Sequence, residues 1–133
     1  MFSLVSDTHA AVWYLQDDPK LSRKSASATD AAIRAGDPIY VPTICLVELT
    51  YLVEKGRVEA SALERLKKAL LIETFGFKLA LLDFNVADAL RRIPRQEVPD
   101  MPDRIIAATA LALNMPLISR DRKIQASAVE TIW

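Results

Sequence analysis

The sequence predicts a three-layer α/β/α sandwich, an α/β fold built on a parallel sheet of about four to five strands. Two observations lead to this fold class. Short apolar runs alternate along the chain with longer segments whose apolar residues recur at helical spacing. Strands that alternate with helices pair in parallel and are covered by helices on both faces. A length of 133 residues suits one domain, residues 1–133, with a single core.

The strand candidates are short apolar runs, each bounded by a Pro, Gly or polar residue. "FSLV" ends before Asp7, and "PIYVP" is closed by Pro42. "FKLALLDF" and "MPLIS" are the third and fourth runs, and "VETIW" is the fifth. In residue numbers the expected strands are 2–5, 38–42, 77–84, 115–119 and 129–133.

Helices are expected between these strands, where apolar residues form one face at helical spacing. Their ranges are 6–15, 21–36, 43–52, 61–72, 85–93 and 101–114. Residue types that cap helices stand at most of the starts. The expected caps are Asp7 or Thr8, Thr43, Ser61 (with Glu64 in a capping box) and Asn85.

Residue counts exclude several classes of function. Seventeen basic residues balance seventeen acidic ones, so no net field attracts nucleic acid or a membrane surface. The three glycines, Gly36, Gly56 and Gly76, are isolated, which excludes a phosphate-binding loop. One histidine and one cysteine do not make an ordinary zinc site. Cys45 is expected to be buried, no apolar run is long enough to span a membrane, and we expect a cytoplasmic protein.

Carboxylates remain as candidate functional groups, and four of them are expected at one edge of the sheet. In open α/β sheets, ligands bind outside the carboxyl ends of the strands. Asp7 directly follows the first strand, and Asp121 follows the fourth. Asp103 lies near the start of a helix, and Glu48 lies one turn into the helix after the second strand. These positions predict that the four side chains share a pocket.

Glu48 is the most informative of these acids because it interrupts the apolar run "TICLVELTYL". A buried carboxylate without a partner costs several kcal/mol or becomes neutral. Its helical neighbours three and four residues away are apolar or aromatic: Ile44, Cys45, Tyr51 and Leu52. The partner of Glu48 is therefore either an Arg or Lys side chain or a divalent cation that it shares with the other acids.

The aspartates also have purely structural interpretations. Asp7 and Asp103 stand where helix caps are common, and Asp121 suits a turn. Taken together, however, four converging carboxylates repel one another strongly when no cation is present. Hard oxygen ligands of this kind suit Mg²⁺ or Mn²⁺.

Three blocks of the chain resemble the PIN-domain family, in its VapC-type toxin ribonuclease branch. These blocks are "SDTHAAVWYLQDDPKLS", "VPTICLVELTYLVEKGR" and "PDMPDRIIAATALALNMPLISRD", and they follow in family order over nearly the whole chain. The resemblance implies an α/β/α fold and a metal-dependent endoribonuclease. The family's acidic residues match Asp7, Glu48, Asp103 and Asp121. Thr8 and Ser119 match small hydroxyl positions that the family keeps beside the acids.

One block departs from the family pattern. Relatives commonly read Asp-Pro-Phe-Asp-Arg where this chain reads "DMPDR", so Asp100 and Asp103 both survive but the proline moves. We expect Asp103 to be the ligand, with Asp100 either a residue behind the ligands or a helix cap. Ser6 replaces a usual apolar residue before Asp7 and leaves the acid in place.

The implied chemistry is phosphodiester hydrolysis by a metal-activated water, which leaves 5′-phosphate and 3′-hydroxyl ends. Asp7, Glu48 and Asp103 are assigned to primary metal binding, and Asp121 to completing the shell or orienting the water. Basic residues near the motifs are candidate contacts to RNA phosphate, or else exposed solubilising charges: Arg104, Arg120, Arg122 and Lys123.

Aromatic residues near the motifs are expected to be structural. Trp13 and Tyr51 are interpreted as core residues, and His9 as a first-turn helix residue rather than a catalytic base. The resemblance also implies a homodimer and a small antitoxin partner that covers the acidic cleft. Two other functions stay open: a non-catalytic PIN-like interaction module, and a metal-dependent phosphatase acting on small phosphate esters.

Overall fold

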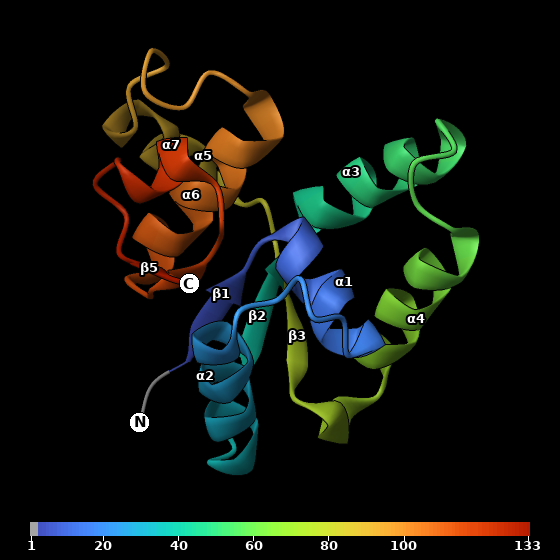
Figure 1. Cartoon of the computed structure of the whole chain (residues 1–133). Coiled ribbons are helices and arrows are strands. Elements are labelled where there is room, and N and C mark those ends of the chain that lie inside the picture. The colour runs from blue at the N-terminus through green and yellow to red at the C-terminus, as the bar shows by residue number, and fades with distance from the viewer. Residues whose placement is uncertain (1–2) are drawn as a thin grey trace.

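The computed structural model describes residues 3–133 and contains a five-stranded sheet in which all neighbouring strands are parallel (Figure 1). The strand order is β3-β2-β1-β4-β5. The strands are β1 (Leu4–Ser6), β2 (Ile39–Pro42), β3 (Phe77–Ala80), β4 (Leu117–Ile118) and β5 (Thr131–Ile132). The chain builds the sheet outward from β1 to β3 and then returns to the other side of β1 with β4. The sheet therefore has a topological switch point between β1 and β4.

Helices cover both faces of the sheet, as the sequence predicts. They are α1 (Thr8–Gln16), α2 (Arg23–Arg34), α3 (Thr43–Glu54), α4 (Ala60–Leu71), α5 (Phe84–Ala89), α6 (Met101–Leu113) and α7 (Arg122–Gln125). Two short 3₁₀ segments, η1 (Glu73–Phe75) and η2 (Leu90–Arg92), complete the list. Helices α5, α6 and α7 lie on one side of the sheet, and α1 and α4 on the other (Figure 1). Helix α3 contacts α6 on one side and α1 and α4 on the other.

The core forms where the central strands meet the small-residue face of α6. Leu4 and Val5 of β1 and Ile39 of β2 are almost fully buried. The segment Ile105–Ala110 of α6 is buried throughout and belongs to the same core cluster as these strand residues. Strands buried on both faces read as continuous apolar runs, which is the pattern that predicted them.

The predicted strands and helices are present, with shifts at their ends. The expected strand 77–84 ends at Ala80, and residues 81–83 lead into α5. The first expected strand began at Phe2, which lies outside the described residues. Helix α7 was not predicted, because four residues are too few to show helical spacing.

Three predicted helix caps are wrong. Pro42 precedes α3, and the Thr43 hydroxyl instead donates to the carbonyl of Ala80 on the neighbouring strand at 3.0 Å. Helix α4 begins one residue before Ser61, so that residue lies inside the helix. Asp83, not Asn85, caps α5, and its carboxylate accepts from the Val86 amide at 3.0 Å.

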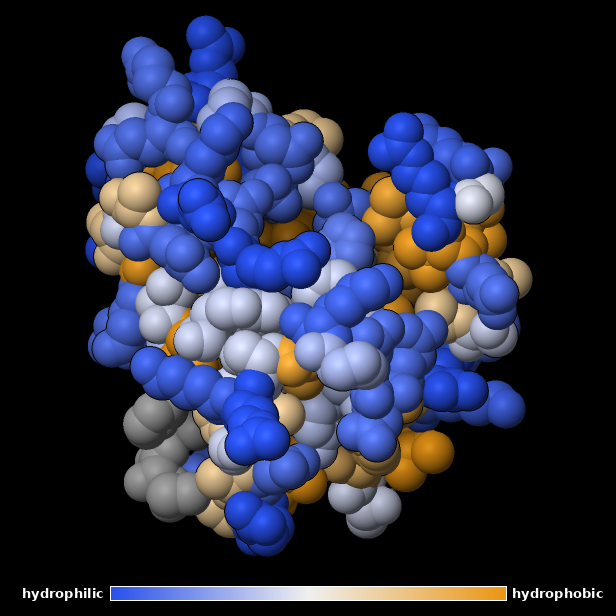
Figure 2. Space-filling model, viewed as in Figure 1, coloured by the Kyte–Doolittle hydropathy of each residue, from blue (hydrophilic) through white to orange (hydrophobic). Residues whose placement is uncertain are grey.

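The surface is hollowed between α6 and the start of α3 (Figure 2). Trp13 is buried, as predicted, with 8% of its surface exposed. The prediction for Tyr51 is wrong, because 59% of its surface is exposed on α3. The residues described, 3–133, include no helix with the length and apolar character needed to cross a membrane.

Candidate metal centre

Parallel strands bring the predicted acids to one edge of the sheet. Asp7 follows β1 directly, and Asp121 lies three residues after β4, on the two sides of the switch point. Helix α6 ends before β4, so its first turn, with Asp103, lies back at the same edge. In open α/β sheets, ligands bind at such a switch point because the loops that follow the two strands run to opposite faces of the sheet and leave a crevice between them.

Asp7 is held by the first turn of α1. Its carboxylate accepts from the amide of Ala10 at 2.9 Å, which makes it the N-cap of the helix. Burial raises the pKa of Asp7, and Glu48 nearby adds to the increase. Hydrogen bonds from the Ala10 amide and the Ser119 side chain act in the opposite direction, because they stabilise the carboxylate.

Glu48 reaches the same place from α3. The Thr8 hydroxyl donates to its Oε1 at 2.5 Å, which joins the first turn of α1 to α3. The two ion pairs within residues 3–133, Lys67–Glu64 and Arg91–Asp88, both lie on exposed helix surfaces. The Arg or Lys partner that was one alternative for Glu48 is therefore not found among the described residues.

Asp100 and Asp103 complete a close group with Glu48. One carboxylate oxygen from each of the three residues lies within 4.8 Å of the other two. Asp100 is also the N-cap of α6 and accepts from the Asp103 amide at 3.2 Å. Burial raises the pKa of Asp103 to about 7, with further increases from the nearby charges of Asp100, Asp121 and Glu48.

Asp121 begins α7. Its Oδ1 accepts from the amides of Lys123 and Ile124 at 2.8 and 3.1 Å. The buried Ser119 hydroxyl accepts from the Asp121 amide at 3.1 Å, so the hydroxyl predicted beside the acids fixes the turn that carries one of them. Asp121 is outside the group of three oxygens, but its charge raises the pKa of Asp103.

All five acids line one cavity of about 310 Å³, here called the acidic cavity. Its lining residues are Asp7, His9, Trp13, Glu48, Asp100, Asp103, Arg120, Asp121 and Trp133. A set of carboxylate oxygens that are close together fits a hard divalent cation such as Mg²⁺ or Mn²⁺. The mutual repulsion that raises the pKa of Asp103 is relieved when a cation is bound.

Capping and metal binding, which the sequence presents as alternatives, are compatible here. Asp7, Asp100 and Asp121 each accept amide hydrogen bonds at a helix start, through Oδ1 in Asp7 and Asp121 and Oδ2 in Asp100. The cap fixes the side chain and leaves a second carboxylate oxygen. Helices α1, α6 and α7 thus direct their positive ends toward the acids, which reduces the cost of gathering negative charge.

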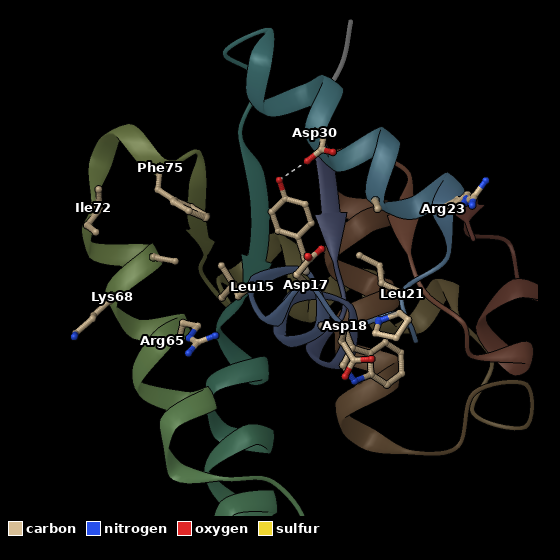
Figure 3. Close-up of a pocket in the computed structure, with 15 residues that line it drawn as sticks. Leu15, Asp17, Asp18, Leu21, Arg23, Asp30, Arg65, Lys68, Ile72 and Phe75 are labelled. Carbon is tan, nitrogen blue, oxygen red and sulfur yellow. Dashed lines mark hydrogen bonds between the residues drawn. The ribbon is translucent and has the colours of Figure 1, made fainter.

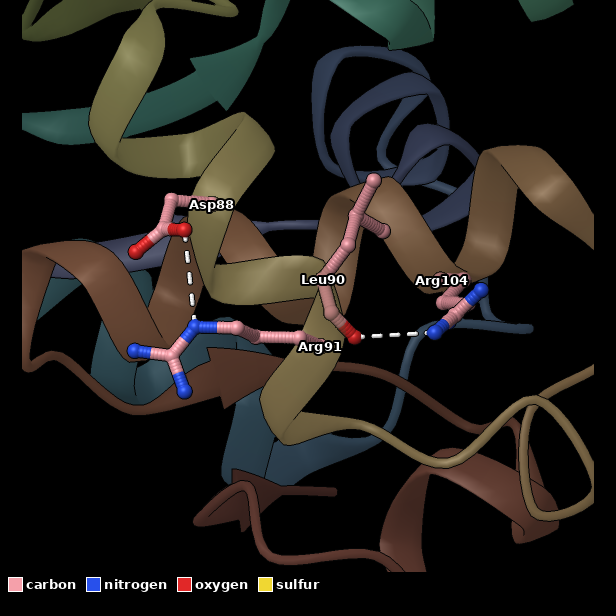
Figure 4. Close-up of polar contacts among 4 residues, drawn as sticks. All are labelled: Asp88, Leu90, Arg91 and Arg104. Atoms are coloured by element: carbon pink, nitrogen blue, oxygen red, sulfur yellow. Dashed lines mark hydrogen bonds and ion pairs between the residues drawn. The ribbon is translucent and has the colours of Figure 1, made fainter.

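Arg104 makes two hydrogen bonds within the chain, and its contact to RNA phosphate stays a prediction. Its Nε donates to the carbonyl of Ile93 at 2.9 Å. Its Nη2 donates to the carbonyl of Leu90 at 3.0 Å, and Figure 4 shows this second bond. The guanidinium therefore holds the end of η2, from which the chain runs to Asp100. By contrast, Arg91 pairs with Asp88 on the exposed surface (Figure 4).

The other basic candidates lie around the acids. The Arg120 guanidinium carbon lies 4.6 Å from the centroid of the Trp13 ring, a cation–π contact at the border of the acidic cavity. Arg122 and Lys123 line an adjoining cavity of about 300 Å³, here called the α7 cavity. It shares Asp100, Asp103 and Asp121 with the acidic cavity.

A larger cavity, of about 770 Å³, lies elsewhere, between α1, α2 and α4 (Figure 3). The Tyr14 hydroxyl donates to Asp30 at 2.6 Å within it, and Arg65 and Lys68 extend from α4. It contains none of the five acids. We place the candidate site at the smaller acidic cavity, because charge convergence rather than volume determines metal binding.

The sequence interpretation missed some of the site. Asp100 was left as a cap or a residue behind the ligands, but one of its carboxylate oxygens lies within 4.8 Å of an oxygen of Glu48 and of Asp103. The spacing of Asp100 and Asp103, three residues apart, was the available signal, because such residues face the same side of a helix start. No sequence signal placed Trp133 at the acidic cavity.

The fold and the acids define a class of protein: an α/β/α domain with a carboxylate centre at its switch point. The sequence profile of the PIN domain family matches residues 4–130. The chain therefore belongs to the PIN domain family.

Individual relatives agree with this assignment. The chain is 28% identical over 130 residues to Ribonuclease VapC22 of Mycobacterium tuberculosis, covering 94% of this chain and 92% of that protein. Its fold resembles a chain in the crystal structure of VapBC2 from Rickettsia felis bound to a DNA fragment of the promoter. That match has a TM-score of 0.70 at 17% identity and covers 98% of this chain and 97% of the other. A chain of FitAcB from Neisseria gonorrhoeae matches with a TM-score of 0.58 at 18% identity, covering 96% and 95%.

Proposed function

We propose that this protein is a metal-dependent endoribonuclease that acts as the toxin of a toxin-antitoxin pair. The observation that carries the proposal is the convergence of Glu48, Asp100 and Asp103 oxygens within 4.8 Å, with Asp7 and Asp121 lining the same cavity. A relative of nearly equal length is named a ribonuclease, which supports the reaction class.

The proposed roles follow from position. Glu48, Asp100 and Asp103 hold the cation, and Asp7 and Asp121 complete the shell or orient the attacking water. Mg²⁺ or Mn²⁺ bound there would offset charge on the phosphate oxygens and lower the pKa of a water. Thr8 and Ser119 keep Glu48 and Asp7 in place through their hydroxyls. Water attack gives 5′-phosphate and 3′-hydroxyl ends.

The test is cleavage of single-stranded RNA by the purified chain with Mg²⁺ or Mn²⁺. Wild type is expected to cleave the RNA at internal positions. The cleavage rate is expected to fall at least about a hundredfold in Asp7→Asn and in Asp103→Asn, because each change disturbs metal binding or the orientation of the water. Glu54→Gln, an exposed acid at the end of the same helix as Glu48, is the matched control.

Equal RNA cleavage by wild type and both Asn variants would contradict the proposal and favour a non-catalytic interaction module. Turnover of nucleotide or sugar phosphates in preference to RNA would favour a phosphatase instead. The same protein preparations serve both assays, so one set of measurements distinguishes the nuclease, the interaction module and the phosphatase.

The proposed partners are a small antitoxin and a second copy of this chain. Two solved neighbours are chains from the structures of VapBC2 and FitAB with bound DNA, which supports an antitoxin partner. The homodimer is proposed from the family resemblance. A single buried cysteine and an RNA substrate agree with action in the cytoplasm, which we retain as part of the proposal.

A further inference from the structure

A second cavity, of about 530 Å³, adjoins the acidic cavity and has a different charge. We call it the basic cavity. It is lined by Thr8, His9, Val12, Trp13, Gln16, Asp18, Lys20, Leu49, Arg57, Val58, Glu59 and Arg120. His9, Trp13 and Arg120 line both cavities, so the two adjoin each other. Its volume lies within the range of ordinary small-ligand sites.

Three cations reach the basic cavity from separate parts of the chain. Lys20 comes from the α1–α2 connection, Arg57 from the α3–α4 turn, and Arg120 from the loop after β4. None of them takes part in either of the two ion pairs found within residues 3–133. Asp18 and Glu59 also line the cavity, but neither neutralises a cation by direct pairing, and Asp18 Oδ1 accepts from the Lys20 amide at 2.9 Å.

One exposed aromatic ring, that of His9, lines the basic cavity together with the cations, and the buried Trp13 packs beside it. The Arg120 guanidinium carbon lies 4.6 Å from the Trp13 ring centroid, and Lys20 Nζ lies 6.0 Å from it. The His9 ring lies 5.4 Å from the same ring and is exposed. Cations that follow a backbone, together with rings that contact bases, are the combination by which proteins bind single-stranded nucleic acid.

The cations near the acidic cavity offset its repulsion of an RNA substrate. The acidic cavity repels a polyanion, and the chain has no net positive charge to offset the repulsion. Cations line both of the cavities that share residues with it, Lys20 and Arg57 in the basic cavity and Arg122 and Lys123 in the α7 cavity. A strand that occupied these cavities would place its scissile phosphate at the acids and its neighbouring phosphates at the cations.

We propose that the basic cavity is a substrate subsite, in which Lys20 and Arg57 bind phosphates of single-stranded RNA on one side of the cut. This inference rests on the proposed function and extends it, because it names where the uncut part of the substrate is held. Lys20 and Arg57 lie near the ends of two of the blocks that carry the family resemblance, but the sequence analysis names neither as a candidate site residue.

The test uses Lys20→Gln with Arg57→Gln, in an Asp103→Asn background that prevents cleavage. Affinity for a fluorescent single-stranded RNA is measured by anisotropy across a salt series. The double variant is expected to bind about tenfold more weakly, and its log–log salt slope to fall by about 0.7 for each lost phosphate contact. Lys24→Gln with Arg34→Gln, which removes equal charge from the exposed face of α2, is the matched control.

Cleavage kinetics in the otherwise wild-type chain give the second measurement. The double variant is expected to raise KM for a long RNA with little change in kcat, and to leave cleavage of a short substrate confined to the acidic cavity unchanged. If wild type cleaves RNA while the double variant matches the control in affinity, salt slope and KM, the subsite is overturned and the nuclease stands.

The same measurements also test the proposed function. Absence of metal-dependent cleavage by wild type contradicts the proposed function itself.

Discussion

Glu48 shows how one residue can report on function. It interrupts an apolar run because its side chain leaves the core side of α3 and enters the acidic cavity, where Thr8 donates to it. A carboxylate in this apolar position costs free energy unless it has a partner. Among the described residues, no basic side chain lies within ion-pair distance of it. A cation is the partner that the remaining carboxylates can share.

Removing this charge is expected to separate stability from metal binding. Glu48→Gln keeps the acceptor for Thr8 but relieves repulsion in the metal-free site, so the melting temperature without metal should stay equal or rise by a few degrees. The rise in melting temperature that Mn²⁺ produces in wild type should largely disappear in Glu48→Gln, because a ligand stabilises the folded state in proportion to how tightly it binds. Differential scanning fluorimetry with and without Mn²⁺ measures both effects. A Mn²⁺ response in Glu48→Gln equal to that of Glu54→Gln would contradict this role.

Asp103 predicts how stability depends on pH. Its pKa in the folded, metal-free protein is about 7, above the ordinary value of 3.8. The folded state therefore binds more protons than the unfolded state between these values, and this contribution to stability is present at low pH and lost as pH rises through about 7. Divalent cations compete with that proton, so their binding should strengthen over the same range.

Urea denaturation in EDTA from pH 4.5 to 8 measures the effect as the difference between wild type and Asp103→Asn. Wild type should lose stability relative to the variant as pH rises. A difference that does not change with pH would mean that the pKa of Asp103 is not raised in the folded state.

The sequence was sufficient to predict which acids lie at this end of the sheet, but only partly sufficient to predict which of them lie close together. Asp7, Glu48, Asp103 and Asp121 follow from the strand order, because parallel strands end at one edge. The contribution of Asp100 was not resolved, since a capping residue and a ligand look alike in sequence. That the acids bind metal stays a prediction, and their common cavity is what supports it.

At the scale of elements, helix starts determine the geometry of the site. Predicting them from single residues failed at Thr43, Ser61 and Asn85, because competing residues stand within two positions of each real start. The long apolar pattern of α6 was recognised because it extends over 13 residues. Helix α7, with four residues, depends on the cap by Asp121 and on packing against α6.

Asp100 allows capping and metal binding to be measured separately. Asp100→Ser keeps an N-cap oxygen without the charge, whereas Asp100→Ala removes both. The Ala variant is expected to lose about 1 kcal/mol of stability and the Ser variant much less. Both should bind Mn²⁺ more weakly, by roughly tenfold or more. Urea denaturation and isothermal titration calorimetry measure the two quantities. Wild-type Mn²⁺ affinity in Asp100→Ser would leave Asp100 as a cap alone.

Arg104 is expected to position the segment that leads to Asp100. Arg104→Met leaves the carbonyls of Leu90 and Ile93 without these donors, which should cost about 1–3 kcal/mol. Amide hydrogen exchange should increase over residues 94–100, and Mn²⁺ affinity should fall although no ligand is changed. Arg91→Met, which removes only an exposed ion pair, should cost less than about 1 kcal/mol. Equal effects of the two substitutions would contradict the positioning role.

At the scale of the whole molecule, the site depends on residues from position 7 to position 121. Glu48 comes from α3 and Asp121 from the start of α7, so no fragment lacking either side of the sheet contains the full set. The fold class was predictable because buried parallel strands and amphipathic helices have distinct patterns. The adjacency of the acidic and basic cavities was not, since it results from packing between loops.

An exposed apolar segment is expected to form the proposed dimer interface. After edge strand β3, Leu81, Leu82 and Phe84 are 64%, 47% and 81% exposed. Single-chain proteins seldom expose such a run, and a second copy would cover it. Phe84→Asp should shift the chain from dimer to monomer in analytical ultracentrifugation. Leu71→Asp, at an equally exposed position on α4, should not. An unchanged sedimentation coefficient for Phe84→Asp would place the interface elsewhere.

The position of Trp133 has a practical consequence for anyone who purifies this protein. Its ring contacts that of Trp13 edge-on at 6.2 Å between centroids, and the residue lines the acidic cavity. An affinity tag of histidines joined after Trp133 would carry imidazoles to the mouth of the cavity and compete for the very ion under study. Leu4 is the first residue of β1 and lies at the amino ends of the parallel strands, whereas the acids lie at their carboxyl ends. A tag fused ahead of the first strand therefore keeps foreign ligands away from the acids.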